Sequence, residues 1–363
     1  MTISIQEAKE ALKINFLANL PVMLKGASGI GKTELALAYA EAQGEDYGIF
    51  ELNAATANLP DVVGVLMPHD ETHVDAEGRE KTITCGRYAY PYFMRDKRTA
   101  RPAFTYKRGL VVIEEYGQAT SDVKRGLASI IWDKRAGEHL FPPNTDILLL
   151  SNRAEDRSGV SKDFDFLINR RVELEVRAEL NGWLVWAHDH GVSNTSLAFA
   201  SRNEDKVFSN KAPDKQGPWL TPRSLVSADR FLEKAVASGY KLDDPFVRAN
   251  LVGMMGEGTA HVYIAFAKIR DHLPSFAAIL ADPHGTPVPT EADQQMFLVF
   301  DLASKAKREN MKQIVAYMDR MPSDFAIAFY RSALQRDGSL RSTQEFGVWA
   351  TKNTSLLSAV AGA

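Results

Sequence analysis

The sequence contains a single cysteine, Cys85, among its 363 residues. One cysteine cannot build an internal disulfide framework or a multi-cysteine zinc site, and this scarcity fits a reducing compartment. No apolar run approaches the length of a transmembrane helix, and the first residues lack the basic flank and apolar stretch of a signal peptide. These absences predict a cytoplasmic protein that does not enter a membrane.

A strong net charge is also absent. The chain carries 43 Lys and Arg against 46 Asp and Glu, a formal net charge of -3 at pH 7. This balance gives no overall attraction to nucleic acid or to an anionic membrane, so any such contact would need a local patch. The length exceeds that at which one hydrophobic core keeps growing, which predicts two or more packed units.

Short apolar runs alternate with helical patterns in the first half of the chain. The runs are "LPVMLKG", "IFEL", "LVVIEE", "TDILLLSNR" and "VELEV", and "TELALAYAEAQG" and "SDVKRGLASIIWDKRAG" have helical periodicity. This alternation predicts an α/β fold, with a mostly parallel sheet and helices on both of its faces. The polar segment "HDETHVDAEGREKTIT" interrupts the pattern and is interpreted as a hairpin-like insertion.

After about Leu180 the apolar pattern is helical only. The segment "ADPHGTPVPTEAD" holds three prolines and few apolar residues, which is typical of a linker or long loop. We therefore predict three domains: an α/β domain at residues 1–180, a helical domain at 181–281 and a helical C-terminal extension at 282–363.

A glycine-rich loop follows the first apolar run. Gly26, Gly31, Lys32 and Thr33 satisfy the pattern G-x-x-x-x-G-K-[ST], with an apolar run before it and a helical pattern after it. Such glycines let backbone N–H groups turn inward, and the following helix directs its positive end at phosphates. The alternative is an ordinary turn into a helix. The predicted ATP-binding residues are Gly26, Ala27, Ser28, Gly29, Ile30, Gly31, Lys32 and Thr33.

Lys32 would neutralise the β- and γ-phosphates of ATP, and the Thr33 hydroxyl would bind Mg2+. Two acids end a later strand pattern, Glu114 as a Mg2+ ligand and Glu115 as the group that orients the attacking water. Glu114 stands where aspartate is usual and is one methylene longer, so its contact with the metal is shifted or mediated by water. A pair of solvated acids at a strand end is the alternative interpretation.

Polar residues at three later positions complete the predicted site. Asn152 follows the next strand and would position the water or sense the γ-phosphate, unless it is a plain turn residue. Arg170 and Arg171 precede another strand, and a guanidinium that reaches a neighbouring subunit's γ-phosphate would stabilise the transition state. Without a ring, both would be surface arginines. Arg223 follows a predicted helix cap, Thr221, and would contact the nucleotide unless its place there is incidental.

Taken in order, "GASGIGKT", "LVVIEE", "LLLSN", "NRR" and "LTPR" resemble the Walker A, Walker B, sensor 1, arginine-finger and sensor 2 positions of AAA+ ATPases. The phrases "LPDVVGV", "WDKRAGEHLFPP" and "NGWLVWAHDHG" resemble the MoxR branch of that family. The resemblance spans residues 21–274. It implies a P-loop NTPase core, in which helices sandwich a parallel sheet, followed by an all-helical lid and a helical extension.

The same resemblance implies a hexameric ring that uses ATP and Mg2+ to remodel other proteins or help them assemble. It further implies a von Willebrand A-type partner protein. Within the core, residues 59–101 would hold a helix insertion that faces the ring pore, and "KRAGEHLFPP" would form a hairpin before Asn152.

Two other functions stay open at this stage. In one, Glu114 makes hydrolysis slow and the chain is a nucleotide-gated scaffold. In the other it is a nucleic-acid motor or loader, which the stretch "RDKRTARPAFTYKRG" favours because it mixes basic and aromatic residues. A charged subunit face explains that stretch equally well, and the acidic total disfavours nucleic acid as a partner.

Overall fold

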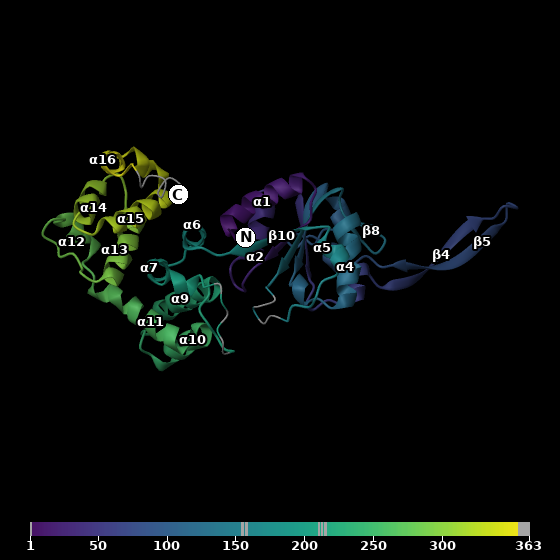
Figure 1. Cartoon of the computed structure of the whole chain (residues 1–363), viewed down its shortest axis with the longest axis horizontal. Coiled ribbons are helices and arrows are strands. Elements are labelled where there is room, and N and C mark those ends of the chain that lie inside the picture. Colours follow the sequence, from purple (N-terminus) through teal and green to yellow (C-terminus); the bar gives the residue numbers. More distant parts are fainter. Residues whose placement is uncertain are drawn as a thin grey trace. The chain divides into compact units, whose positions relative to one another are not determined.

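The computed structural model describes residues 2–153, 156, 159–209, 211, 213 and 216–354. The chain divides into two compact units (Figure 1). We call Met1–Ala178, with Asn210–Ala212, the α/β unit, and Glu179–Ser209 with Pro213–Ala363 the helical unit. The separation of residues 282–363 as a third domain stays a prediction.

The α/β unit is built on a six-stranded parallel sheet. Its strand order is β1-β10-β2-β9-β6-β3, and every neighbouring pair is parallel. Five strands coincide with the apolar runs of the sequence, and the parallel α/β fold is confirmed. The sixth, β1, has three residues and was not predicted. The strands are β1 (Thr2–Ser4), β2 (Val22–Lys25), β3 (Tyr47–Asn53), β6 (Arg108–Glu114), β9 (Asn144–Ser151) and β10 (Val172–Arg177).

Helices cover both faces of this sheet. On one face α1 (Ile5–Leu17) packs against α2 (Lys32–Glu41), which also contacts β3, β6 and β9. On the other face the apolar stripe of α4 (Ser121–Asp133) shares one buried cluster with alternate residues of β6 and β9. That face also carries the short helices α3 (Leu59–Val63) and α5 (Asp165–Ile168). Because both faces are covered, the central residues of β2, β6 and β9 are buried and apolar.

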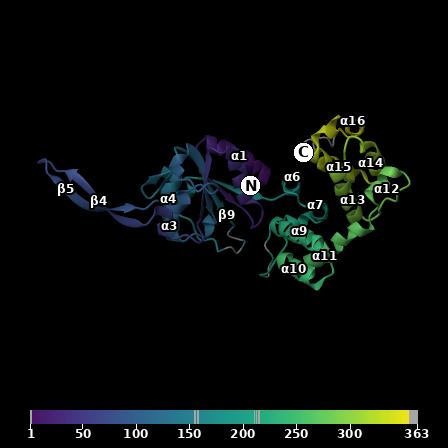
Figure 2. The ribbon, with the colours of Figure 1, turned by 180° about the vertical axis from the view of Figure 1, so that it is seen from behind.

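A long antiparallel hairpin formed by β4 (Leu66–Val74) and β5 (Glu80–Tyr88) projects from the α/β unit (Figures 1 and 2). The polar hairpin expected here is present, and the short helix α3 precedes it within residues 59–101. A helix insertion that faces a ring pore stays a prediction. Threonines favour strand pairing, and the Thr72 and Thr82 hydroxyls form a hydrogen bond across the hairpin at 3.0 Å.

A second, small hairpin lies where one was expected before β9, formed by β7 (Arg135–Ala136) and β8 (His139–Leu140). Two short 3-10 helices precede β6, η1 (Tyr92–Met94) and η2 (Ala103–Thr105).

Among its described residues, the helical unit contains two apolar clusters. One includes Phe199 and Tyr263, whose ring centroids lie 5.0 Å apart, and the other includes Tyr317 and Phe329. The helices are α6 (Leu180–Asp189), α7 (Asn194–Arg202), α8 (Glu204–Val207), α9 (Pro222–Ala237), α10 (Pro245–Met255), α11 (Glu257–Lys268), η5 (Ile269–His272), α12 (Phe276–Ala281), α13 (Ala292–Lys305), α14 (Met311–Met318), α15 (Ser323–Arg336), η6 (Gly338–Ser342) and α16 (Gln344–Lys352).

Helix α13 contributes to both clusters of this unit, Phe297 and Phe300 to the first and Leu298 and Val299 to the second. Throughout the described residues, no helix combines the length and the apolar character that crossing a membrane requires.

Candidate functional site

The glycine-rich loop connects β2 to α2 in a conformation that requires its glycines. Gly29 and Gly31 have positive φ angles of 76° and 100°, which other residues rarely adopt. A Cβ atom at Gly26 would lie 2.6 Å from the backbone oxygen of Val176. Because α2 begins at Lys32, its free N–H groups and the positive end of its dipole lie at this loop. The loop therefore has the backbone of an anion-binding site.

Lys32 folds back over the loop that precedes it. Its Nζ donates hydrogen bonds to the backbone oxygens of Gly26 and Ala27, at 2.8 and 2.9 Å. It also donates to Oδ1 of Asn152 at 3.1 Å. The ammonium thus lies beside the loop backbone, where a bound phosphate could accept its hydrogen bonds in place of these oxygens.

The strand order brings the other predicted residues to the same edge. β9 lies between β2 and β6, so Asn152 stands between the loop and the acids that follow β6. Its Nδ2 donates to Oε2 of Glu115 at 2.9 Å. Glu115 itself has a positive φ of 50°, a strained conformation for a residue with a side chain. Lys32, Asn152 and Glu115 therefore form one continuous hydrogen-bonded network.

Glu114 is mostly buried beside Thr33. The Thr33 side chain lies close enough to the Glu114 carboxylate to affect its pKa, and Glu114 Oε1 has no hydrogen-bond partner among the described residues. Burial raises the pKa of Glu114 above its ordinary value, and the nearby charges of Glu51 and Glu115 raise it further. A buried carboxylate oxygen without a partner is costly, and a divalent cation at Thr33 and Glu114 would satisfy it.

No group of three or more His, Cys, Asp or Glu in the described part of the chain is arranged to hold a metal. A cation at Thr33 and Glu114 would therefore take most of its ligands from phosphate oxygens and water. That coordination is characteristic of Mg2+, which keeps several waters and uses one or two carboxylates.

The prediction that Arg171 is a catalytic arginine needs correction. Its side chain is 1% exposed and forms ion pairs with Asp163 and Glu173, the latter at 2.6 Å. It also donates to the Tyr116 hydroxyl at 3.1 Å. A guanidinium bound on several sides within its own chain cannot extend to another subunit, so Arg171 has a structural role here.

Arg170, in contrast, is exposed, and its guanidinium carbon lies 3.9 Å from the centre of the Trp132 ring. It precedes β10, whose first residue, Val172, donates to the backbone oxygen of Pro21 just before β2. Arg170 therefore lies at the amino edge of the parallel sheet, and the glycine-rich loop lies at the carboxyl edge. The four residues of β2 separate the two by roughly 13 Å, so Arg170 cannot act on the loop of its own chain.

Arg223 belongs to the helical unit and is an exposed residue in the first turn of α9. The predicted cap is present, because Thr221 Oγ1 accepts from the backbone N–H of Ser224 at 3.1 Å and Pro222 opens the helix. A contact between Arg223 and a nucleotide stays a prediction.

Sequence reasoning missed a set of buried polar residues that follow Glu115 in the chain. Tyr116 is fully buried and donates from its hydroxyl to Asp163 at 2.8 Å. Lys124 is also buried and donates to Ser161 Oγ at 2.8 Å. The one available signal was Lys124, a lysine beside Val123 on the apolar face of a predicted helix.

The basic stretch before β6 binds largely to its own chain. Lys97 pairs with Glu51 at 2.5 Å, and Arg98 donates to the backbone oxygen of Tyr47 at 2.5 Å. Arg108 donates to a backbone oxygen of the loop after α2 at 2.8 Å. These interactions account for three of its basic residues without any nucleic acid.

No protein-family model matches this chain, and no curated protein matches it. Solved structures resemble it at low identity. The ATP complex of NtrX from Brucella abortus has 15% identity and a TM-score of 0.36, and the match covers 98% of this chain and 68% of NtrX. The RuvB Holliday junction branch migration motor of Thermotoga maritima has 15% identity and a TM-score of 0.38, covering 87% and 86%.

A candidate ATPase from Cytophaga hutchinsonii has 10% identity and a TM-score of 0.32, and this chain covers 60% of its length. Identities and TM-scores this low carry no inference about activity. The function must therefore be argued from the arrangement of the loop, Lys32, Glu114, Glu115 and Asn152.

Proposed function

We propose that this protein is an AAA+ ATPase of the MoxR type, which hydrolyses ATP with Mg2+ in an oligomeric ring to remodel partner proteins or help them assemble. The observation that carries the proposal is the hydrogen-bonded network of Lys32, Asn152 and Glu115 beside the pair of Thr33 and Glu114. This combination provides a phosphate cation, a water-orienting carboxylate and a metal-binding edge around one loop.

Different groups of the chain bind the phosphates and orient the water during phosphoryl transfer to water. Backbone N–H groups at the start of α2 hold the phosphates, and Lys32 exchanges its loop oxygens for phosphate oxygens. Glu115 accepts a proton from the attacking water. Asn152 donates to one oxygen of Glu115 and so fixes the direction in which the carboxylate faces.

Mg2+ would neutralise charge on the phosphates as they separate. Thr33 and Glu114 would hold it, because Glu114 Oε1 is a buried oxygen without a partner in the described structure. The Glu114 side chain must be ionised for this, although burial raises its pKa. That requirement supports the alternative of a nucleotide-gated scaffold, in which binding sets the assembly and hydrolysis is slow.

The ring is inferred from the location of Arg170. An exposed guanidinium at the amino edge of the sheet cannot serve its own loop, and it can stabilise transition-state charge only in a neighbouring subunit. A hexamer, and a von Willebrand A-type partner, rest on the family resemblance alone. Lys97, Arg98 and Arg108 form ion pairs or hydrogen bonds within their own chain, and these interactions count against a nucleic-acid motor.

The test is ATP turnover measured together with particle mass, with and without Mg2+ and ATP. Four proteins are compared: the wild type, Glu115→Gln, Arg170→Ala and a control, Arg125→Ala, which changes an exposed arginine of α4. We expect nucleotide-dependent assembly in all four, turnover in the wild type and the control, and none in Glu115→Gln, which should still bind ATP.

Mixing inactive Glu115→Gln with inactive Arg170→Ala should restore part of the turnover, because some interfaces then combine an intact Glu115 with an intact Arg170. A wild type that assembles but does not hydrolyse ATP would favour the scaffold. Turnover that rises with added nucleic acid and falls steeply with salt would favour the motor. A wild type that does not bind ATP would refute all three functions.

A further inference from the structure

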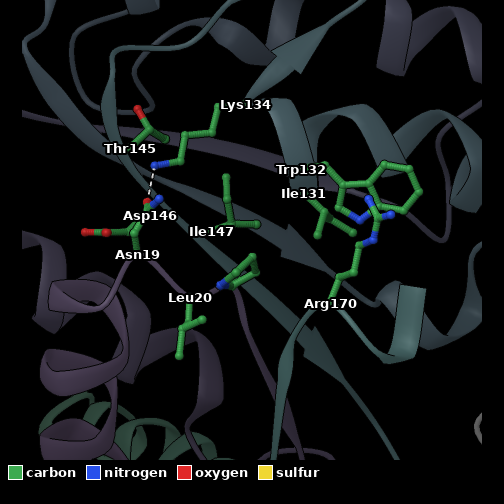
Figure 3. A pocket seen from close by; sticks show the side chains of 10 residues that line it. Asn19, Leu20, Ile131, Trp132, Lys134, Thr145, Asp146, Ile147 and Arg170 are labelled. Carbon is green, nitrogen blue, oxygen red and sulfur yellow. Dashed lines mark hydrogen bonds between the residues drawn. The ribbon is translucent and has the colours of Figure 1, made fainter. Parts of the chain in front are cut away.

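A pocket of about 270 Å3 lies at the amino edge of the sheet, away from the glycine-rich loop (Figure 3). Its walls come from the residues before β2, the end of α4, the start of β9 and the residue pair before β10. This volume is close to the lower limit of about 300 Å3 for small-molecule sites. It is therefore large enough for a small ligand.

Two buried hydrogen-bonding groups of the pocket have no partner among the described residues. They are the hydroxyl of Thr145, a residue with 0% exposure, and the indole N–H of Trp132. A buried polar group without a partner is costly, so native proteins rarely retain one without a reason. Both groups can donate, and a ligand with acceptor atoms would satisfy them.

Two cations line the same pocket. Lys134 has a positive φ of 51° and donates from Nζ to Oδ1 of Asn19 at 2.5 Å (Figure 3). Arg170 reaches the pocket from the opposite wall and lies over the Trp132 ring. Burial of its ammonium lowers the pKa of Lys134, and the nearby charge of Asp146 opposes this shift.

One acid, Asp146, also lines the pocket, and its carboxylate already accepts from the Tyr47 hydroxyl at 2.6 Å. The formal charge of the lining is therefore +1, with two donors that no protein acceptor satisfies. The pocket thus favours an anion over a cation or a neutral polar ligand.

The rest of the wall is apolar. Leu20, Ile131 and Ile147 line the pocket together with Pro21. A simple inorganic anion would leave these side chains against water, whereas a short hydrocarbon chain would cover them. Figure 3 shows Ile147 between Lys134 and Thr145 on one side and Trp132 on the other, and this combination of donors and aliphatic groups defines the ligand class.

We propose that this pocket binds a small organic carboxylate that carries a short aliphatic chain. The carboxylate accepts hydrogen bonds from Lys134 and Thr145, and the chain packs against Ile147 and Ile131 toward Trp132. The site is separate from the ATP site and does not depend on it.

A consequence for turnover rests on the proposed function. Arg170 both lines this pocket and is the group proposed to reach a neighbouring subunit. A ligand whose aliphatic chain lies against Trp132 fixes Arg170 over that ring and withdraws it from the neighbour. The ligand should therefore lower ATP turnover without weakening ATP binding.

The test is calorimetric titration of the full-length protein with butyrate, with its uncharged analogue butyramide and with inorganic phosphate. The variants are Thr145→Val, which keeps the shape and removes the hydroxyl, and Lys134→Gln. The control is Lys13→Gln, an exposed lysine of α1. We expect saturable butyrate binding with a Kd of about 1 mM or tighter, weakened about tenfold in both variants and unchanged in the control.

Butyramide and phosphate should both bind more weakly than butyrate. Equal butyrate binding by all four proteins, or no saturation of the wild type by about 10 mM, would overturn the assignment. Phosphate binding tighter than butyrate binding would overturn it too, because the aliphatic wall would then contribute nothing. Butyrate that binds but leaves turnover unchanged would refute only the coupling through Arg170. A protein that binds butyrate and never hydrolyses ATP would refute the proposed function and retain the pocket.

Discussion

His188 of α6 should make the helical unit sensitive to mild acid. Its Nε2 lies 3.0 Å from Ser332 Oγ on α15, and its buried Nδ1 has no hydrogen-bond partner in the described structure. Burial lowers the pKa of His188 to about 4, and the nearby charge of Arg336 lowers it further. A protonated ring would place a second cation beside Arg336 and leave its Nδ1 proton without an acceptor.

The sign of the effect follows from proton uptake. The pKa of an unfolded histidine is about 6.5, so between that value and about 4 the unfolded chain binds more protons at His188 than the folded chain does. Stability is therefore unaffected by His188 above about pH 7 and falls as the pH falls toward 4. At about pH 5 the loss amounts to roughly 2 kcal/mol as an upper limit, and solvent screening of this partly buried ring reduces it.

The assay is urea unfolding at about pH 7.5 and about pH 5, followed by the fluorescence of Trp183 and Trp186 in the same helix. The wild type should lose about 1 to 2 kcal/mol more than His188→Gln over this interval, since glutamine does not titrate. His190→Gln is the matched control, because this exposed histidine lies two residues away and stacks on Trp186. Equal pH dependence of the wild type and His188→Gln would refute the reasoning.

Three further predictions concern stability and metal binding. Arg171→Met should destabilise the α/β unit by about 3 kcal/mol in urea unfolding, because Asp163 and Glu173 lose their buried cation; full stability of the variant would show that the ion pairs are dispensable. Burial raises the pKa of Glu114, so ATP turnover should begin to decline at a higher pH than it would with an ordinary glutamate. Raising the Mg2+ concentration should move the midpoint of this acid decline to lower pH. A midpoint that does not move would exclude Glu114 as a Mg2+ ligand. Thr221→Ala should cost the helical unit about 1 kcal/mol through loss of the α9 cap, and Thr221→Ser should restore it.

Much of the sheet could be predicted because a strand buried on both faces is apolar over its central residues. β6 and β9 are such strands, and each ends in polar residues at one edge of the sheet. The loop was predictable for a similar reason, since the positive φ angles at Gly29 and Gly31 restrict the residues that fit there. In both cases a local physical requirement leaves a local pattern.

Other features depend on contacts that no local pattern records. β1 has three residues and becomes a strand only because β10 lies beside it. The hairpin of β4 and β5 occupies much of the segment where the family resemblance implied an insertion, and such a resemblance carries over a position in the chain rather than its local conformation. The burial of Arg171 depends on Asp163, which lies on a segment that had no predicted element.

The lateral order of the strands matters more to the site than the order of the residues along the chain. In sequence Asn152 comes last, yet β9 lies between β2 and β6 and makes its amide the link between Lys32 and Glu115. The two ends of that amide are chemically different, since Oδ1 can only accept from Lys32 and Nδ2 can only donate to Glu115. A carboxylate in its place would still bind Lys32, but it would repel Glu115 and leave it without a donor. Asn152→Asp replaces only the amide nitrogen by an oxygen, and it should therefore impair turnover. Because one end of an amide accepts and the other donates, an amide is the suitable group between a cation and a carboxylate.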